Sequence, residues 1–123
     1  MAMANLIREK CRPCNAEESV ISEEEMKELL PQVPDWRVEE RDGIKRLVRE
    51  FKFNSYSEAM TFTNRTAQLA EEMGHHPAML TEWGKVTVSW WTHKIKGLHR
   101  NDFVMAARTD VVYDRVSSLA EIS

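Results

Sequence analysis

Apolar and polar residues alternate along two parts of the chain, as they do in half-buried β-strands. The first part comprises residues 36–39 and 44–53, which flank Asp42-Gly43, a dipeptide typical of tight hairpin turns. The alternation breaks only at Leu47-Val48, where two apolar residues are adjacent. The pattern therefore predicts an antiparallel hairpin over residues 36–53.

A second hairpin is predicted further along the chain. Residues 86–93 are β-branched and aromatic with a period of two, which makes them the clearest predicted strand. Residues 80–83 form a short extended segment, and Trp83-Gly84-Lys85 forms the turn between the two. Trp90 and Trp91 would point to opposite faces of the sheet. One is expected in the core, and the other in the core, at an interface or against a planar ligand.

Helical spacing follows two capping-box sequences, in which a serine and a glutamate satisfy free backbone N–H groups. The first, Ser22-Glu23-Glu24-Glu25, starts a short predicted helix that stops at Pro31. The second, Ser55-Tyr56-Ser57-Glu58, starts the longest predicted helix. Gly74 is well placed to end that helix in a left-handed conformation. A last helix is expected to start near Asn101.

The resulting order is helix, strand, strand, helix, strand, strand, helix. It predicts an α+β fold, with a four-stranded antiparallel sheet and three helices packed on one face. Residues 21–123 are expected to form a single domain, and residues 1–20, which have weak periodicity, a loosely ordered N-terminal arm. The uncovered sheet face and the sheet edges favour a homo-oligomer.

Composition and charge exclude some classes of function and location. The net charge of −3 argues against a broad basic surface that binds nucleic acid or an anionic membrane nonspecifically. No apolar run is long enough to span a bilayer, and residues 1–10 lack the apolar region of a secretory signal. We therefore expect a cytoplasmic protein without a membrane partner. In that compartment Cys11 and Cys14 are expected to be free thiols.

Candidate chemistry gathers around three of the four histidines. His75 and His76 follow the end of the long predicted helix, and His93 lies at the end of the clearest strand. A hairpin turning near Gly84 would bring residues near 76 opposite residues near 92, so the three histidines could share a cleft. Glu71 and Asp102 add a carboxylate on each side of the histidines. Histidine can both donate and accept a proton near neutral pH, so the cluster favours acid–base chemistry.

A metal site would use the same residues. Adjacent histidines in an extended loop tend to point apart, which fits chelation less well than a His-x-x-x-His pair on a helix. Cys11 and Cys14 could supplement them, so a zinc-dependent protein remains an alternative. The alternative to a chemical role is that these histidines lie at the surface, or lie in the core with their hydrogen bonds satisfied. Nucleophilic catalysis and phosphate binding are disfavoured, because the chain has no Gly-x-Ser-x-Gly elbow and no Gly-rich phosphate loop.

The segment Glu71-x-x-x-His75-His76-Pro77, followed by Trp83, His93 and Asp102, resembles the signature of the pterin-4a-carbinolamine dehydratases. The resemblance extends from Ser22 to about Asp110 and is strongest with the bacterial branch. It implies a four-stranded antiparallel sheet with helices on one face, assembled as a homodimer or homotetramer.

The family's reaction removes water from 4a-hydroxytetrahydrobiopterin, which an aromatic amino acid hydroxylase releases, and gives quinonoid dihydrobiopterin. The resemblance implies no metal and no organic cofactor. It also implies a functional link to an enzyme such as phenylalanine hydroxylase. There are two alternatives. The substrate could be another reduced pterin, or the protein could be a noncatalytic regulatory or oligomerisation module.

The resemblance also implies roles for individual residues. His75, His76 and His93 would be catalytic. Our own hypothesis is that His75 works on the 4a-hydroxyl, that His93 is the complementary acid or base, and that His76 binds and orients the pterin. Glu71 and Asp102 would set histidine tautomers and hold histidine charge. The residues expected to line the substrate site are His75, His76, Pro77, Thr92, His93, Lys94 and Ile95. Animal members carry other residues at Gly74, Lys94 and Asn101, and their nuclear transcription-factor partner is not expected here.

Metal analysis distinguishes the two interpretations of the histidine cluster. We expect the purified protein to retain activity after dialysis against a chelator and to contain no stoichiometric metal, because the acid–base interpretation needs none. Zinc at one equivalent per chain would contradict the metal-free mechanism.

Overall fold

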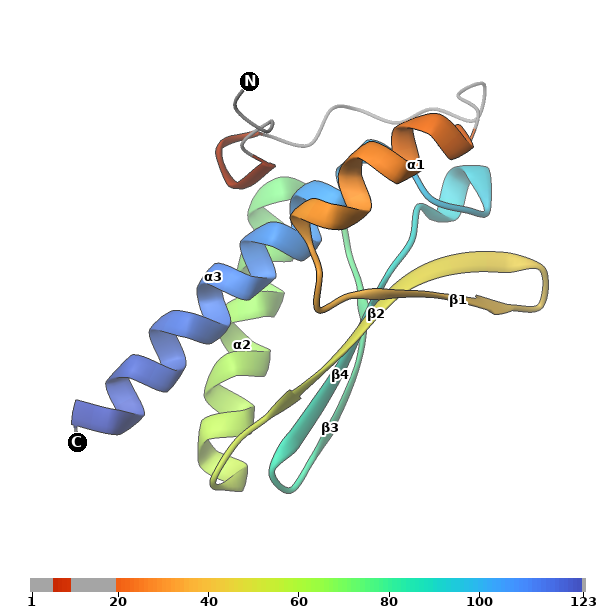
Figure 1. Ribbon diagram of the computed structural model, residues 1–123. Coiled ribbons are helices and arrows are strands. Elements are labelled where there is room, and N and C mark those ends of the chain that lie inside the picture. Colours follow the sequence, from red (N-terminus) through yellow and green to blue (C-terminus); the bar gives the residue numbers. More distant parts are fainter. Residues whose placement is uncertain (1–5, 10–19, 123) are drawn as a thin grey trace.

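Four antiparallel strands form one sheet in the order β1-β2-β4-β3, and helices precede, interrupt and follow them (Figure 1). The computed structural model describes residues 6–9 and 20–122, with side chains described as far as residue 118. The strands are β1 (Arg37–Arg41), β2 (Ile44–Lys52), β3 (Ala78–Glu82) and β4 (Lys85–Trp90). The α-helices are α1 (Glu23–Leu29), α2 (Tyr56–Met73) and α3 (Arg100–Ile122), and the 3₁₀-helices are η1 (Leu6–Arg8), η2 (Leu30–Gln32) and η3 (His93–Ile95). This arrangement confirms the predicted α+β fold.

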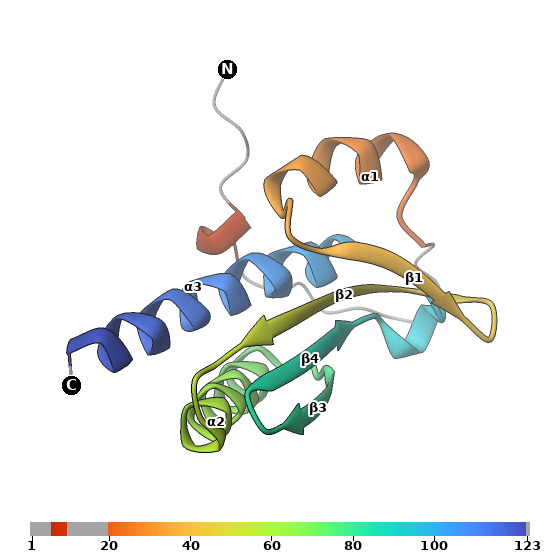
Figure 2. The same cartoon turned by 60° about the horizontal axis from the view of Figure 1, so that its bottom comes forward.

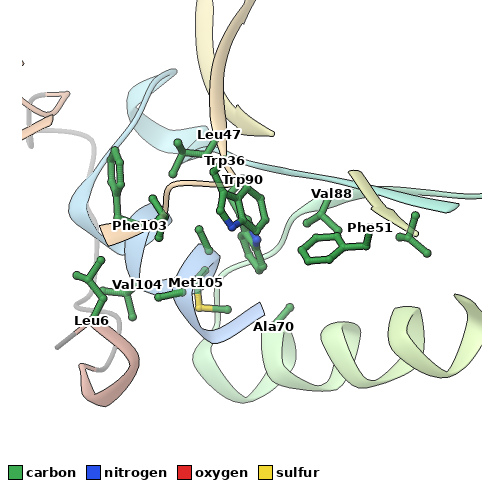
Figure 3. Close-up of a cluster of buried hydrophobic side chains, with 14 of the residues drawn as sticks. Leu6, Trp36, Leu47, Phe51, Ala70, Val88, Trp90, Phe103, Val104 and Met105 are labelled. Atoms are coloured by element: carbon green, nitrogen blue, oxygen red, sulfur yellow. The ribbon is translucent and has the colours of Figure 1, made fainter. Parts of the chain in front are cut away.

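One face of the sheet is buried under the helices. The side chains of Val86, Val88 and Trp90 on β4 are fully buried, whereas the alternating residues between them are partly exposed. Helices α2 and α3 pack against this face and against each other (Figure 2). Helix α1 adds Leu29 to the same core, and Figure 3 shows Trp90 in the middle of the buried side chains. The period of two in β4 therefore decides which side chains form the core.

The helix boundaries follow from local chemistry. The hydroxyl oxygens of Ser22 and Ser55 accept hydrogen bonds from the backbone N–H groups of Glu25 and Glu58, each at 3.1 Å. In both predicted capping boxes, the hydrogen bond from the glutamate backbone N–H to the serine hydroxyl oxygen is thus present. Gly74 ends α2 with φ 66° and ψ 28°, a left-handed conformation that costs glycine little. The chain therefore leaves α2 directly into the loop that carries the histidines.

Turn geometry sets the register of both hairpins. Asp42 and Gly43 both have positive φ, as a two-residue turn of the primed type requires, and Arg41 pairs with Ile44. In the second hairpin Ala78 pairs with Ser89. Continued by three residues, this register places residue 75 opposite residue 92, close to the predicted alignment.

The second hairpin differs from the prediction at its ends. Strand β3 starts at Ala78, earlier than expected, and β4 ends at Trp90 instead of continuing to His93. Thr92 forms an isolated bridge with Gly97, and Lys96 between them has a positive φ of 51°. This tight return draws the backbone out of the sheet. His93 therefore lies at the start of η3, in a loop, and the prediction that it ends the strand is wrong.

Residues 6–9 are anchored to α3. The side chain of Leu6 is buried in the core, although a loosely ordered arm is predicted over residues 1–20. The Glu9 carboxylate accepts two hydrogen bonds from the Arg100 guanidinium, at 2.8 and 2.7 Å. The Arg108 guanidinium donates to the Glu9 carbonyl oxygen at 3.0 and 2.6 Å. These contacts are nonlocal, so sequence periodicity could not reveal them; Cys11 and Cys14 lie outside the described residues.

No helix among the described residues is both long and apolar enough to cross a membrane.

A partly buried polar cluster joins the β1 end of the sheet to α3. The Asp110 carboxylate accepts hydrogen bonds from the Trp36 indole at 2.8 Å and the Arg49 guanidinium at 2.6 Å. Burial raises the pKa of Asp110 above its ordinary value, and the bonds from Trp36 and Arg49 act in the opposite direction. The Arg49 guanidinium also lies over the Phe51 ring, 4.4 Å from its centroid. Asp110 therefore satisfies the Trp36 indole and is the nearer of two carboxylates at Arg49, since Asp35 lies 3.7 Å from the same guanidinium nitrogen.

Replacement of Asp110 by alanine should destabilise the fold by about 2 kcal/mol, because it leaves the Trp36 and Arg49 donors partly buried without their acceptor. Urea unfolding followed by tryptophan fluorescence measures the loss. The matched control is Asp114→Ala, an exposed position on the same helix, which should change the free energy of unfolding by less than about 0.5 kcal/mol. Equal effects of the two substitutions would contradict the assignment.

Candidate active site

The site is organised around one fully buried carboxylate, that of Asp102 in the first turn of α3. Its Oδ1 lies 2.6 Å from Nε2 of His75. Its Oδ2 accepts hydrogen bonds from the Thr92 hydroxyl at 2.8 Å and from the backbone N–H of His99 at 2.9 Å. Three chain segments thus meet at one side chain: the loop after α2, the loop after β4, and the start of α3.

The start of α3 explains how Asp102 is held. Arg100 is the first helical residue, so His99 is the N-cap. Nδ1 of His99 accepts a hydrogen bond from the Asn101 N–H at 3.1 Å, and the Asp102 carboxylate returns to the His99 N–H. This is the reciprocal arrangement of a capping box, with histidine in place of serine. Asp102 therefore caps its own helix with one oxygen and binds His75 with the other.

The His75 imidazole is fixed on two sides. Only 11% of its side chain is exposed, and its ring stacks parallel to the indole of Trp90, with 5.7 Å between centroids and 6° between planes. An ionised carboxylate can only accept hydrogen bonds, so Nε2 carries the proton that faces Asp102. The remaining nitrogen, Nδ1, is then the acceptor of the neutral ring. The environment selects one ring orientation and one tautomer.

His76 has the same kind of partner in a different setting. Its Nε2 lies 2.6 Å from Oε1 of Glu71, which belongs to the last turn of α2. The two side chains are 58% and 78% exposed, so water screens their interaction. The structure therefore brings both predicted carboxylates to histidines, but only the pair of His75 and Asp102 is buried.

His93 lies apart from these two pairs. Its side chain is exposed, and its ring packs on Trp91 with a centroid distance of 4.5 Å. In the described part of the chain, His93 forms no hydrogen bond with His75 or His76. The guanidinium of Arg46 covers the Trp91 ring at 4.1 Å from its centroid. The expected meeting of three histidines is thus not a direct side-chain contact.

The other predicted site residues differ in how exposed their side chains are to solvent. Lys94 is exposed, and Pro77 and Ile95 are half-buried, so they lie at the surface near the histidines in sequence. Thr92 is buried, and its hydroxyl is directed to Asp102. It therefore supports the carboxylate, a role that the sequence did not suggest.

Sequence reasoning also missed two contacts that hold the buried pair. Trp90 lies on the face of β4 that also carries the buried Val86 and Val88, and its ring nevertheless stacks on His75. The backbone N–H of His99 could have been suspected from its place three residues before Asp102, the capping-box spacing. Histidine is not a usual N-cap residue, which hid that signal.

A cavity of about 190 Å³ lies elsewhere, between the start of α1, the β1–β2 hairpin and the loop after η3. It is lined by Val20, Ile21, Glu23, Met26, Glu40, Gly43, Lys45, Lys96, Gly97 and Leu98, none of them a predicted site residue. Within residues 6–9 and 20–122, no three His, Cys, Asp or Glu side chains gather as they would around a metal ion.

Known proteins resemble this chain over most of its length. The family model described as "Pterin 4 alpha carbinolamine dehydratase" matches residues 19–112. The chain belongs to the pterin-4a-carbinolamine dehydratase family. A protein of Nitrosococcus oceani named "Putative pterin-4-alpha-carbinolamine dehydratase" is 58% identical over 108 residues, which cover 88% of this chain and 96% of that protein.

Two solved structures share the fold of this family member. A "transcriptional coactivator/pterin dehydratase" from Brucella melitensis superposes with a TM-score of 0.69 at 30% identity, covering 77% of this chain and 99% of that one. A "pterin dehydratase-like protein", identified as a RuBisCO assembly factor in the alpha-carboxysome, gives a TM-score of 0.55 at 25% identity, with 64% and 89% covered. The descriptions of these two proteins thus include roles other than dehydration.

The two histidine–carboxylate pairs of this pterin-4a-carbinolamine dehydratase family member should differ in their contribution to stability. Asp102→Asn should lower the free energy of unfolding by about 2 kcal/mol, because an amide cannot accept all three buried hydrogen bonds. Glu71→Gln, the same change at the exposed pair, should alter it by less than about 0.5 kcal/mol. Chemical denaturation of both variants measures the difference. A larger loss for Glu71→Gln would contradict the assigned burial of the two pairs.

Proposed function

We propose that this protein dehydrates 4a-hydroxytetrahydrobiopterin to quinonoid dihydrobiopterin and water by histidine acid–base catalysis. The observation that carries the proposal is the buried, stacked His75 whose Nε2 is held by Asp102. Membership of the pterin-4a-carbinolamine dehydratase family supports the substrate class. A family member built for structure alone would have no need to hold an imidazole in one tautomer with a fully buried carboxylate.

The reaction needs one acid and one base. The bond between C4a and the hydroxyl oxygen breaks, and hydroxide is a poor leaving group unless a proton reaches it. The N5 proton leaves at the same time, so a second group must accept it. One proton is donated and one is accepted, and the products are water and the quinonoid pterin. Positioned groups of this kind typically contribute 10²–10⁴-fold to the rate.

The environments of the histidines support different roles. His75, with one tautomer fixed by Asp102, acts on the 4a-hydroxyl, and His93 is the complementary acid or base. His76 is exposed beside Glu71, and it binds and orients the pterin together with Pro77, Lys94 and Ile95. Thr92 and Asp102 are buried supports of His75. This assignment uses side chains alone and needs neither a metal nor an organic cofactor.

The proposal places the protein after an aromatic amino acid hydroxylase in the cytoplasm. A hydroxylase of that class releases the 4a-hydroxypterin, and a reductase must then reduce the quinonoid product to regenerate tetrahydrobiopterin. A functional link to phenylalanine hydroxylase follows from this chemistry. A homodimer or homotetramer is expected, since among the described residues β1 and β3 are edge strands that each pair with a neighbour on one side only.

A second candidate is an assembly or regulatory role without catalysis. It is favoured by the fold shared with a protein described as a RuBisCO assembly factor. The two candidates differ in one measurable property, the rate of carbinolamine dehydration by purified protein. A rate no greater than the uncatalysed rate with biopterin and with other reduced pterins would favour the second candidate.

Alanine substitutions test the roles of the histidines. His75→Ala and His93→Ala should each lower kcat by about 10²-fold or more, because each removes a proton-transfer group. His76→Ala should mainly raise KM, because its role is binding. The measurement is a steady-state dehydration assay, with circular dichroism as the check of folding. Lys27→Ala, an exposed position on α1, is the control and should keep wild-type activity. Full activity in both His75→Ala and His93→Ala would refute the site assignment.

A further inference from the structure

We propose that Trp91 and Arg46 are positioning residues for His93: they hold its exposed imidazole in the orientation that proton transfer requires. This inference rests on the proposed function, and it adds two residues that neither the family signature nor the histidine–carboxylate pairs include. It starts from a contrast among the histidines. His75 and His76 each have a carboxylate at 2.6 Å, whereas His93 has an aromatic ring contact instead.

The backbone at His93 is already fixed. Thr92 and Gly97 form an antiparallel bridge, in which the Thr92 N–H donates to the Gly97 carbonyl at 2.8 Å. The Lys96 N–H donates to the His93 carbonyl at 3.3 Å and closes η3. These bonds determine where the His93 side chain begins. They do not determine its side-chain torsions, and an exposed imidazole without a hydrogen bond would otherwise populate several rotamers.

Trp91 supplies the missing constraint. Its ring centroid lies 4.5 Å from that of His93, with 37° between the planes, which is a close aromatic contact. Trp91 and His93 are two residues apart, so an extended backbone at Thr92 puts them on the same side. Trp91 is itself half-buried, so its indole offers His93 a surface that is more ordered than a fully exposed side chain.

Arg46 fixes Trp91 from the neighbouring strand. Leu47 pairs with Trp90 across β2 and β4, so the same register puts Arg46 directly opposite Trp91. The guanidinium carbon of Arg46 lies 4.1 Å from the Trp91 ring centroid, a cation–π distance. The Nε atom of Arg46 is buried and has no hydrogen-bond partner in the described part of the chain. The contact with the Trp91 ring is thus the interaction that the structure shows for this part of the Arg46 guanidinium.

The three side chains form one row: Arg46 on β2, Trp91 after β4 and His93 at the start of η3. A purely structural role would explain Arg46 on Trp91, but it would not explain why the ring of an exposed histidine packs against them. A direct role of Trp91 as a wall for the pterin is the competing explanation. The two explanations differ in whether the effect of Trp91 depends on His93.

A double-mutant cycle with the full-length protein tests that dependence. Trp91→Leu should lower kcat about three- to tenfold with little change in KM, since the lost aromatic contact frees the His93 rotamer. Trp91→Phe should retain most of the rate. In a His93→Ala background, Trp91→Leu should have no further effect on kcat. The proposal would be overturned if Trp91→Leu lowered kcat by the same factor in both backgrounds, or if it changed only KM.

The arginine has a matched control on the same face of the sheet. Arg46→Met keeps an unbranched apolar stem and removes the guanidinium with its charge, and it should lower kcat in the same direction as Trp91→Leu but by less. Arg41→Met is the control, because Arg41 is exposed at the end of β1 and contacts no aromatic ring among the described residues. Equal rates for the two arginine variants would remove Arg46 from the proposal.

A second readout does not depend on activity. The ring protons of His93 should show a ring-current shift in the NMR spectrum, and Trp91→Leu should abolish it while the His76 signals stay in place. Unchanged His93 signals would overturn the proposal. If the wild type has no dehydratase activity, the proposed function fails while the NMR result still decides the positioning. If wild type is active and His93→Ala is impaired, but Trp91→Leu is normal, only this inference fails.

Discussion

The burial of the Asp102 carboxylate is the constraint on which the rest of the site depends. An ionised carboxylate that leaves water loses several kcal/mol of solvation unless the protein replaces its hydrogen bonds. Here the replacements come from the His75 ring, the Thr92 hydroxyl and the His99 backbone. Its place in the first turn of α3 adds the favourable field of the helix N-terminus. Each donor belongs to a different segment, so the carboxylate can be satisfied only when all three segments are in place.

This arrangement separates the histidines by environment, although they are close in the sequence. His75 is enclosed by Asp102 and Trp90, His76 forms an exposed hydrogen bond with Glu71, and His93 leaves the sheet on a tight loop. Acid–base catalysis needs groups that behave differently from one another, and identical side chains acquire that difference only from their surroundings. The loop that carries His75 and His76 makes the division possible, because adjacent residues in an extended segment point in opposite directions.

The sequence predicted the parts of the fold that short-range chemistry controls. Capping at Ser22 and Ser55, the left-handed end of α2 at Gly74 and the turn at Asp42-Gly43 all depend on residues within four positions of each other. The alternation of Val86, Val88 and Trp90 likewise identified the buried face of β4. The register near Gly84 followed from the turn, and it placed the residue 75 loop beside residue 92.

The features that the sequence did not predict depend on contacts that a local sequence pattern does not reveal. The end of β4 at Trp90 is set by the bridge between Thr92 and Gly97, which competes with continued pairing to the neighbouring strands. The inward direction of the Thr92 hydroxyl depends on Asp102, which lies on the far side of the η3 loop, beyond the reach of a strand or helix period. The histidine cap of α3 was hidden because capping preferences favour other residue types.

The start of α3 also links the site to a part of the chain that the family model does not cover. That model begins at residue 19, yet Leu6 is buried in the same core as Trp90 and Phe103. Arg100, two residues before Asp102, binds the Glu9 carboxylate at 2.7 and 2.8 Å and reaches Glu25 of α1 at 3.2 Å. The first turn of α3 is thus held from outside by an ion-pair network and from inside by the Asp102 hydrogen bonds. Because isolated surface pairs contribute little, the bidentate geometry and the buried leucine must account for most of the anchoring of residues 6–9. The residues that precede the matched domain therefore contribute to the packing that holds the helix of the Asp102 carboxylate in place.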